Sequence, residues 1–353
     1  MSAAARAALA AAFVLAWSSG FVGAELATRT AATATVLAWR FLVAAPLLLV
    51  PVLLVRGLAP TWRQVGVQVG VGLLAQCGYL GGVVLAIQLG VPSGTTALVA
   101  ALQPIAATAA AGSLLGERVS RGQWAGLWIG LAGVSVVVGG DLTTGTAPWP
   151  AYLLPVGAML SLVAATLAER RSTMSPERSG GPALVTSVAV QSAVSAVLFS
   201  GVALARGEFL PPVSGGFAFA IGWVVVLSTF GGYGLYWLVL RTSGVARVSS
   251  LLYLTPPVTM LGSALMFGDP VTAATVAGTV VCLAAVWLVQ RPTSEPVPQL
   301  AGQGEWQVSE RELRRHSSLV LRRVAEGATV RVNRDGRPVA EIRPLAPCAA
   351  EQP

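Results

Sequence analysis

Hydrophobic residues in this chain gather into long runs separated by short polar segments. Ten runs approach the length of about 20 residues that a helix needs to cross a bilayer core of about 30 Å. Ten such runs in succession are not typical of buried helices in a water-soluble protein, so we predict ten transmembrane helices. The predicted helices are Ala7–Leu26, Ala34–Val55, Val65–Leu89, Ser93–Leu115, Gln123–Gly140, Tyr152–Ala168, Ala183–Ala205, Phe217–Leu240, Val245–Phe267 and Val271–Gln290.

The ten runs form two sets of five, and the second set repeats a pattern of the first. Pro104, inside the fourth run, is followed thirteen residues later by Glu117, and at an offset of 152 residues Pro256 and Asp269 stand in the same relation. Because five is odd, two such copies enter the membrane in opposite directions. Carriers with inverted repeats bind their solute between the repeats. We therefore predict an all-α polytopic membrane protein whose two inverted five-helix repeats span residues 1–140 and 141–291.

Composition and charge agree with a membrane protein. Hydrophobic residues make up 54% of the chain, charged residues only 11%, and the mean hydropathy is +0.71. Every basic residue is arginine, and with the N-terminus inside, eleven arginines fall in cytoplasmic segments against two, Arg29 and Arg206, outside. This bias predicts two cytoplasmic termini. The net charge of +8 then requires no nucleic-acid partner.

The residues of the repeat resemble a known family. The segment Trp17-Ser18-Ser19-Gly20-Phe21, the pair Arg40-Phe41 and the twice-repeated Pro…Gly-Glu/Asp…Gly pattern are similar to the EamA-type drug/metabolite transporter superfamily, over residues 7–291. The resemblance implies a carrier of ten helices that moves small metabolites, often outward. The second repeat departs from the pattern, with Asp269 where glutamate is usual.

Two charged residues lie within or beside the first two predicted helices. Arg40 is six or seven residues into the second helix, and Glu25 lies at the outer end of the first, across a short hairpin. A structural ion pair near the outer interface is one interpretation. Alternatively, Glu25 carries a proton or Arg40 binds an anionic substrate, since charges inside a bilayer are often functional. Snorkelling of the arginine to the interface is a third interpretation.

Helix breaks and polar faces predict a central cavity. Pro104 and the pair Pro256-Pro257 interrupt the fourth and ninth helices, and such matched interruptions point to a binding site between repeats. Packing kinks, interhelical hydrogen bonds and an interfacial aromatic belt are the alternatives. The predicted substrate-binding residues, many of them aromatic with a polar tip, are Trp17, Gln76, Tyr79, Gln103, Tyr233, Tyr236, Trp237 and Tyr253.

The sequence predicts neither an enzyme nor a cofactor. His316 is the single histidine, and the three cysteines are scattered without a metal-binding or disulfide spacing. We find no intramembrane set of residues with the composition of a catalytic or metal site.

Residues after Arg291 have a different character. Residues 292–304 are rich in proline and glycine and predict a linker. A short strand at 306–308 precedes a helix opened by Ser309 and Glu312 as a capping box and ended by Gly327. Strands at 329–333 and 338–343 then flank an Asp335-Gly336 turn. We predict a small α+β domain at 305–346, too small for a stable core alone, and a disordered end at 347–353.

This tail resembles the prevent-host-death (Phd/YefM) antitoxin family in Val308-Ser309, Glu326-Gly327 and the run 334–340. The resemblance implies a dimerising, operator-binding module that contacts phosphates through Arg311, Arg314 and Arg315. Only eight residues follow Leu345, so a toxin-binding segment is not expected. Nine arginines against seven acids in residues 301–353 predict weak DNA binding. A retained DNA or dimerisation module, a fusion remnant and a cytoplasmic regulatory cap all remain open.

The preferred prediction is a secondary transporter in the inner (cytoplasmic) membrane. It would export a small organic metabolite, amino acid or drug by alternating access, with a small molecule and the lipid bilayer as its partners and a homodimer through the tail as a further option. The alternative is a membrane-tethered, DNA-binding regulator whose helices serve as anchor or sensor. An anchor would need neither ten spans nor repeated prolines.

Overall fold

The computed structural model describes most of the chain. The described residues are 3–55, 60–115, 121–144, 147–173, 184–232, 234–236, 238–239, 242, 251–290, 305–309, 313, 317–334 and 337–344. They divide into two compact units, one up to Gln290 and one from Arg291, which we describe separately.

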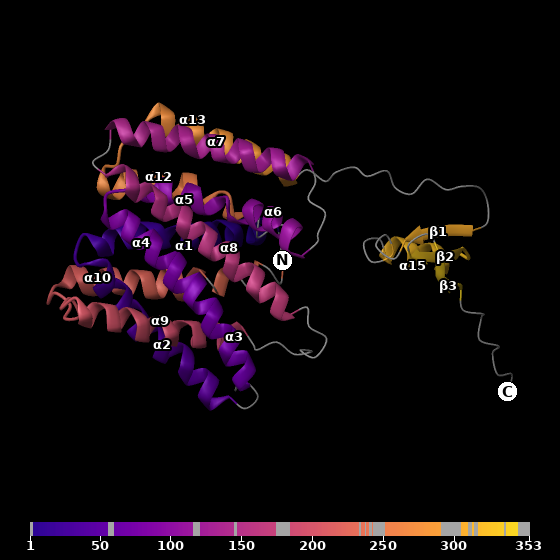
Figure 1. The fold of residues 1–353 in the computed structure, drawn as a ribbon, viewed down its shortest axis with the longest axis horizontal. Helices are drawn as coiled ribbons and strands as arrows, with labels where there is room; N and C mark the ends of the chain where they lie inside the picture. Colours follow the sequence, from indigo (N-terminus) through magenta and orange to yellow (C-terminus); the bar gives the residue numbers. More distant parts are fainter. Residues whose placement is uncertain are drawn as a thin grey trace. The chain divides into compact units, whose positions relative to one another are not determined.

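The first unit is a bundle of helices (Figure 1). Several of them are interrupted by short segments of 3-10 or π geometry. Its elements are α1 (Ala3–Thr28), α2 (Thr33–Leu54), α3 (Trp62–Gly72), η1 (Leu73–Gly78), α4 (Tyr79–Gln88), α5 (Ser93–Ala101), α6 (Gln103–Leu115), α7 (Arg121–Thr144), η2 (Trp149–Tyr152), α8 (Leu153–Thr173), α9 (Leu184–Ala205), α10 (Gly215–Trp223), η4 (Val224–Gly232), α12 (Thr255–Phe267) and α13 (Ala273–Gln290).

Seven of these helical stretches are long and apolar enough to cross a membrane. They are Ala4–Thr28, Thr33–Leu54, Trp62–Gln88, Trp124–Thr143, Trp149–Glu169, Val185–Ala205 and Gly215–Tyr236. The predicted fourth helix is divided between α5 and α6, and α12 covers only the second half of the predicted ninth. The predicted tenth is represented by a shorter apolar helix within α13. The count of ten spans therefore stays a prediction, while a multi-pass helical membrane protein agrees with these findings.

The distribution of side chains is that of a protein surrounded by lipid. Large apolar residues such as Leu53 and Leu265 are 79% and 77% exposed on the outside of the bundle. Polar residues such as Gln68, Thr96 and Ser263 are at most 3% exposed. In a bilayer, apolar side chains can face the acyl chains at no penalty, and polar groups must find partners inside the protein.

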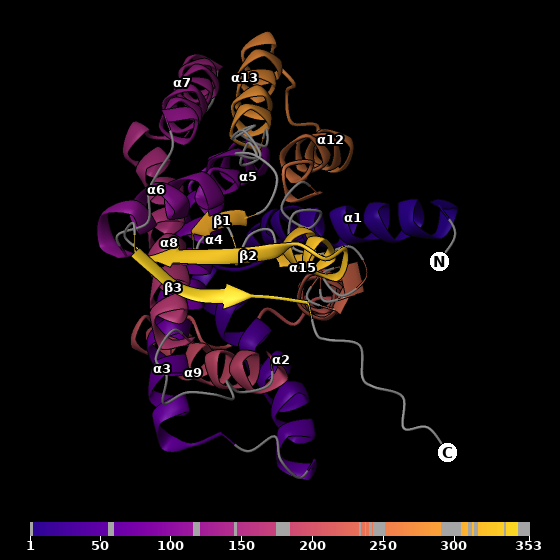
Figure 2. The same cartoon turned by 90° about the vertical axis from the view of Figure 1, so that its right-hand side faces the viewer.

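Three pairs of helices from the two halves of the bundle pack together. α7 packs against α13, α2 against α9, and α5 against α12; the first two pairs lie side by side in both views (Figures 1 and 2). Glycine permits the closest of these contacts. A Cβ atom added at Gly278 of α13 would lie 2.5 Å from the carbonyl oxygen of Gly133 in α7. Small residues bring the two backbones together, as is common between membrane helices.

The third predicted span contains a π-helical segment. α3, η1 and α4 follow one another without a break from Trp62 to Gln88. A π turn holds an extra residue, so the spacing of three and four residues that the sequence predicts for one polar face does not hold across η1. A second π segment, η4, lies in the second half of the chain.

The second unit is a three-stranded sheet with one helix. Strand β1 (Glu305–Ser309) pairs in parallel with β2 (Thr329–Arg334), which pairs antiparallel with β3 (Arg337–Ile342). Helix α15 (Ser317–Ala325) covers a small core, and Gly327 follows it with a φ of +98°, which favours glycine. The observed order of strand, helix and hairpin agrees with the sequence prediction. Glu312 and the Asp335-Gly336 turn lie outside the described residues. The residues of this core are Val308, Val320, Val324, Val330 and Val332.

Candidate functional site

Two helices of the bundle are interrupted beside the prolines of the repeated pattern. Between α5 and α6, the Leu102 N–H donates to the Val99 carbonyl at 3.1 Å, and before α12 the Leu254 N–H donates to the Leu251 carbonyl at 3.0 Å. Each bond closes a tight turn just before a proline. The two bonds are 152 residues apart, the offset of the proline and acid pattern.

The prolines themselves lie at the beginnings of helices. Pro104 is the second residue of α6, and Pro256 and Pro257 are the second and third of α12. The sequence predicts that these prolines interrupt the fourth and ninth spans, and a helix begins beside each of them within its predicted span. Proline is tolerated at these positions because the first residues of a helix have no intrahelical acceptor for their N–H groups.

A side chain of α1 satisfies one of the backbone groups at the second interruption. The Ser18 hydroxyl donates to the Thr255 carbonyl at 3.3 Å, and both residues are buried. The hydroxyl oxygens of Thr255 and Thr259 are buried and, among the described residues, have no hydrogen-bond partner. Buried hydroxyls of this kind call for an explanation, such as a water or a bound solute.

Two of the predicted site residues form an aromatic cluster. The ring centroids of Trp17 in α1 and Tyr236 are 5.9 Å apart, and Phe13 lies 5.7 Å from Trp17 and 6.1 Å from Tyr236. The sequence predicted Trp17 and Tyr236 but not Phe13. Both predicted residues are partly exposed. Tyr233 and Trp237, which were predicted to join them, lie outside the described residues.

The remaining predicted binding residues lie elsewhere in the bundle. Tyr79 packs against the apolar core around α2 and α9. Tyr253 is buried in a second core that includes side chains of α5, α7 and α8. The Gln103 amide donates to the Thr166 hydroxyl of α8 at 3.0 Å. The structure therefore brings Trp17 and Tyr236 into one cluster and distributes Tyr79, Gln103 and Tyr253 over other interfaces.

Gln76 belongs to a chain of hydrogen bonds that we call the amide ladder, formed by Gln68, Gln76, Glu169, Gln191 and Ser195. The Gln68 amide donates to both Glu169 carboxylate oxygens, at 3.2 and 3.1 Å, and its own oxygen accepts from Gln191 at 2.7 Å. Gln76 donates to Gln191 at 3.4 Å and accepts from Ser195 at 3.0 Å. The ladder joins α3 and η1 to α8 and α9. Gln191 and Glu169 were not predicted as site residues.

Arg40 and Glu25 do not form the ion pair that the sequence suggested. Glu25 pairs instead with Arg29 at 2.8 Å, one helical turn further along α1. Arg40 is 6% exposed, and its guanidinium donates to the hydroxyls of Ser228 and Thr229 in η4 at 3.4 and 3.3 Å. Glu25 pairs with Arg29 rather than with Arg40 because α1 continues to Thr28, which places the Arg29 side chain within reach of the Glu25 carboxylate.

The ends of several helices enclose a cavity of about 380 Å³, which we call the acidic cavity. Its charged side chains are Glu25, Arg29, Asp141 and Asp269. The Asp141 carboxylate accepts a hydrogen bond of 2.6 Å from Thr95, and the Arg29 guanidinium lies 4.2 Å from the centre of the Phe267 ring. Three carboxyl groups facing one guanidinium make the cavity electronegative.

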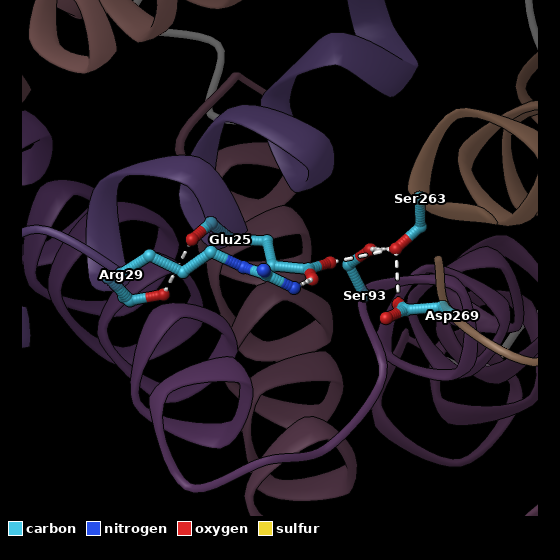
Figure 3. A network of polar contacts seen from close by, with 6 residues as sticks. Glu25, Arg29, Ser93, Ser263 and Asp269 are labelled. Atoms are coloured by element: carbon cyan, nitrogen blue, oxygen red, sulfur yellow. Dashed lines mark hydrogen bonds and ion pairs between the residues drawn. The ribbon is translucent and has the colours of Figure 1, made fainter. Parts of the chain in front are cut away.

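One buried hydroxyl connects the two sides of the acidic cavity (Figure 3). Ser263 of α12 contacts Glu25 Oε2 at 2.8 Å and the Asp269 carboxyl, and the Ser93 hydroxyl of α5 lies 3.1 Å from its oxygen. Among the described residues, no set of three His, Cys, Asp or Glu side chains is placed to hold a metal ion. The arrangement is therefore a hydrogen-bonded junction of α1, α5 and α12.

Sequence reasoning named Glu25 and Asp269 but missed Asp141, Ser93 and Ser263. Asp141 could have been found from the sequence. Like Glu25 and Asp269, it lies at the end of an apolar run, and the arginine pattern predicts that this end of each run is on the outer side. Single serines in apolar runs give no such signal. Glu117 and the tail residues Arg311, Arg314 and Arg315 lie outside the described residues.

Comparison with known proteins identifies the family. The EamA-like transporter family model matches the chain twice, over residues 5–139 and 149–291. The inner membrane transporter YedA of Escherichia coli K12, described as uncharacterized, is 29% identical over 226 residues, covering 63% of this chain and 70% of YedA. A probable amino-acid metabolite efflux pump of Salmonella typhimurium is 24% identical over 226 residues, covering 62% of this chain and 74% of the pump.

A solved crystal structure shares the fold. It superposes with a TM-score of 0.54 at 21% identity and covers 82% of this chain and 98% of its own. The family match and the named relatives, together with the seven apolar helices, describe a transporter, not an enzyme, that crosses the inner membrane several times. The chain belongs to the EamA-like transporter family.

Proposed function

We propose that the protein exports small organic metabolites, amino acids or drugs by alternating access between two inverted five-helix repeats. The observation that carries this proposal is the recurrence of the same helix interruptions 152 residues apart. Moved by 152 residues, η1 (Leu73–Gly78) falls at 225–230, inside η4 (Val224–Gly232). The tight turns before Pro104 and Pro256 are related by the same offset. Discontinuous helices at matching positions are typical of the solute site in such carriers.

Helix packing supports a two-fold relation between the repeats. In the predicted numbering of spans, the pairs α2 with α9, α5 with α12 and α7 with α13 join the second, fourth and fifth spans of one repeat to their counterparts. The thiol of Cys282 donates to the carbonyl of Gly130 at 3.4 Å, and these two residues are themselves 152 apart. A contact between such counterparts is what a two-fold axis between the repeats would produce.

The acidic cavity supports the proposed alternation of the spans. Its lining comes from the ends of α1, α4, α7 and α12 and the beginnings of α5 and α13. The positive-inside rule assigns each of these points to the outer side. The amide ladder includes Gln68 of α3, in the first half of the third span, and Glu169 near the end of α8, which the rule assigns to the inner half. Both termini would then be cytoplasmic.

The solute path would pass the aromatic cluster and the helix interruptions. Trp17 and Tyr236 offer ring faces, and the Thr255 and Thr259 hydroxyls offer hydrogen bonds that no described residue uses. Such a mixture suits an amphiphilic solute with a few polar groups. One relative is named a probable amino-acid metabolite efflux pump, which supports outward transport of amino-acid-like compounds.

The transport experiment compares Tyr236→Ala with Trp128→Ala. A strain overexpressing the protein would first be screened for resistance to toxic amino acids and dyes, and efflux of a compound identified in this way would be measured. Loss of one aromatic contact, worth about 0.5–1.5 kcal/mol, should lower efflux by Tyr236→Ala about two- to tenfold. Tyr79→Ala gives a second test of the predicted path. Trp128 is 64% exposed on α7, so its removal should leave efflux unchanged. Equal efflux by all three variants and the parent would contradict the proposed path.

Reporter fusions test the inverted repeats independently of any substrate. A fusion after Leu115 should report the cytoplasmic side, and a fusion after Pro270 the outer side, because the two proline and acid patterns belong to oppositely oriented copies. Both fusions on the same side would refute the inverted arrangement.

The tail is the subject of a separate proposal. The strand, helix and hairpin order of β1, α15, β2 and β3 fits the Phd/YefM-like module suggested by the sequence. Such a module would dimerise and contact DNA, which makes a membrane-tethered regulator the second candidate function. Detergent-solubilised full-length protein should then retard DNA from its own promoter region in a gel, and should do so less at higher salt. An unchanged DNA mobility would leave the tail without a DNA-binding role.

A further inference from the structure

The Thr255 and Thr259 hydroxyls of α12 make no hydrogen bond to any described residue, although both residues are deeply buried. Thr255 is 4% exposed and Thr259 is fully buried. A threonine hydroxyl inside a helix often donates to the carbonyl four residues before it. The carbonyl before Thr255, that of Leu251, accepts the Leu254 N–H instead, at 3.0 Å. The carbonyl before Thr259, that of Thr255, accepts from the Ser18 hydroxyl at 3.3 Å, so both threonines can donate to a further group.

These two hydroxyls lie at the positively polarised end of a helix. Thr255 is the first residue of α12, which runs for 13 residues to Phe267, and Thr259 follows one turn later on the same face. The aligned peptide dipoles of the helix place partial positive charge at this end. Pro256 and Pro257 have no N–H group to donate. The Thr255 hydroxyl is therefore the side-chain donor that the beginning of α12 can present to an anion.

The corresponding side chain of the first repeat already has a partner. Gln103, the first residue of α6, stands 152 residues before Thr255, and its amide donates to the Thr166 hydroxyl at 3.0 Å. Both positions lie near the middle of their predicted spans, at the interruptions that the proposed function assigns to the solute. Of these two helix beginnings, the one at α12 has the donor that remains unused.

We propose that Thr255 and Thr259 bind the carboxylate of the exported solute. Side chains four residues apart on a helix lie about 5–6 Å from each other, so a carboxylate can accept one hydrogen bond on each of its two oxygens. Hydrogen bonds to a charged group are stronger than those between neutral groups, and half-helix beginnings face anionic solute groups in other carriers. The neighbouring helices cover both hydroxyls in this conformation, so the solute reaches them when α12 separates from α1. The proposal rests on the proposed alternating access and adds the chemical class of the solute.

Ligand binding tests this site without a transport assay. The melting temperature of the purified full-length protein in detergent would be measured with each of the common amino acids and with benzoate. A compound that binds the folded protein raises its melting temperature. Every compound that binds would then be compared with its amide, which has the same shape but no negative charge. At least one acid should bind, and its amide should bind about tenfold more weakly or worse, because a hydrogen bond to a charged group is lost.

Variants of the two threonines show whether their hydroxyls bind the acid. Thr255→Val keeps the shape of the side chain without its hydroxyl and should weaken binding of the acid about tenfold or more. Thr255→Ser keeps a hydroxyl and should bind like the parent. Thr259→Val gives a second test and serves if Thr255→Val does not fold. Thr279→Val on α13 is the matched control: its hydroxyl donates to a carbonyl of its own helix at 2.7 Å, so binding should be unchanged.

Three results would overturn the carboxylate site. They are a parent protein that binds none of the acids, amides that bind as tightly as their acids, and folded Thr255→Val and Thr259→Val variants that bind an acid like the parent. Binding and export can fail separately. A protein that binds acids through these threonines but exports nothing would contradict the proposed function, whereas undiminished export by Thr255→Val of a compound without a carboxylate would reject the site alone.

Discussion

The amide ladder and the acidic cavity are two polar systems along the same span, α3–η1–α4. Gln68 in its first half and Gln76 near its middle belong to the ladder, and Gln88 at its end lines the cavity. In the ladder, each amide contact has its own hydrogen and ends on a single carboxylate, Glu169. In the cavity, three carboxyl groups face one guanidinium, and one hydroxyl serves two acceptors.

The difference separates a seam between helices from the wall of a cavity. The hydrogen bonds of the ladder join amides to one another and to one carboxylate, and they fix α8 and α9 against α3. At the Ser263 junction, one hydroxyl contacts two carboxyl groups that line the cavity. Variants of the acidic cavity should therefore affect transport, and variants of the amide ladder should affect stability.

Removing the Glu25 carboxylate from the acidic cavity should have the largest effect on efflux. Glu25→Ala leaves Arg29 and Ser263 without their shared acceptor and unties α1 from α12. We expect efflux to fall about tenfold or more, the order of magnitude for loss of a charged contact worth about 1.5–3 kcal/mol. Efflux per molecule of inserted protein is the measurement. Glu208→Ala is the matched control, and similar efflux by the two variants would remove the acidic cavity from the mechanism.

A methyl group in the π segment η1, which contains Gln76 of the ladder, should destabilise the bundle. At Gly78, a Cβ atom would lie 2.1 Å from the Ser161 hydroxyl, which donates to the Leu74 carbonyl at 2.8 Å. We expect Gly78→Ala to lower the free energy of unfolding by about 1–3 kcal/mol. Gly157→Ala on α8, where no atom lies within 4 Å, should stabilise the helix by up to about 1 kcal/mol. Unfolding in detergent measures both, and equal effects would show that η1 packs more loosely than described.

Breaking the ladder should reduce stability rather than transport. Gln191→Leu leaves the Gln68 oxygen and the Gln76 amide, each in a residue 3% exposed, without that partner. Hydrogen bonds between membrane helices are worth about 0.6 kcal/mol on average and up to about 1.7, so we expect a loss of about 1–2 kcal/mol in the free energy of unfolding. Efflux per folded molecule should be unchanged. A large loss of efflux at unchanged stability would make the ladder part of the solute path.

Much of the helical scaffold follows directly from the sequence. The apolar runs located all seven long helices, because length and hydrophobicity are properties of each run by itself. Trp17 and Tyr236 meet as proposed members of one site, and the tail has the expected order of strand, helix and hairpin. These features depend on local pattern or on an internal repeat, both of which are visible in one chain.

The contacts that define the acidic cavity could not be predicted in the same way. Ser93 and Ser263 are ordinary small residues within apolar runs, and only the packing of α5 against α12 brings their hydroxyls together. Glu25 pairs with Arg29 rather than Arg40 because α1 continues to Thr28, two residues beyond its predicted end, and places Arg29 one helical turn from Glu25. The π segments change which residues share a face, and no pattern of three and four residues reveals them in advance.

Deleting the tail should have the smallest effect on export. The deletion tests whether the amide ladder or the acidic cavity depends on the tail. The bundle up to Gln290 and the unit from Arg291 are separately compact, and all members of the amide ladder and the acidic cavity lie in the bundle. A protein ending at Arg291 should therefore export at the parental rate. The sheet and helix of the tail bury their valines in a core of their own. A substantial loss of efflux at normal membrane insertion would instead make the tail part of the transporter.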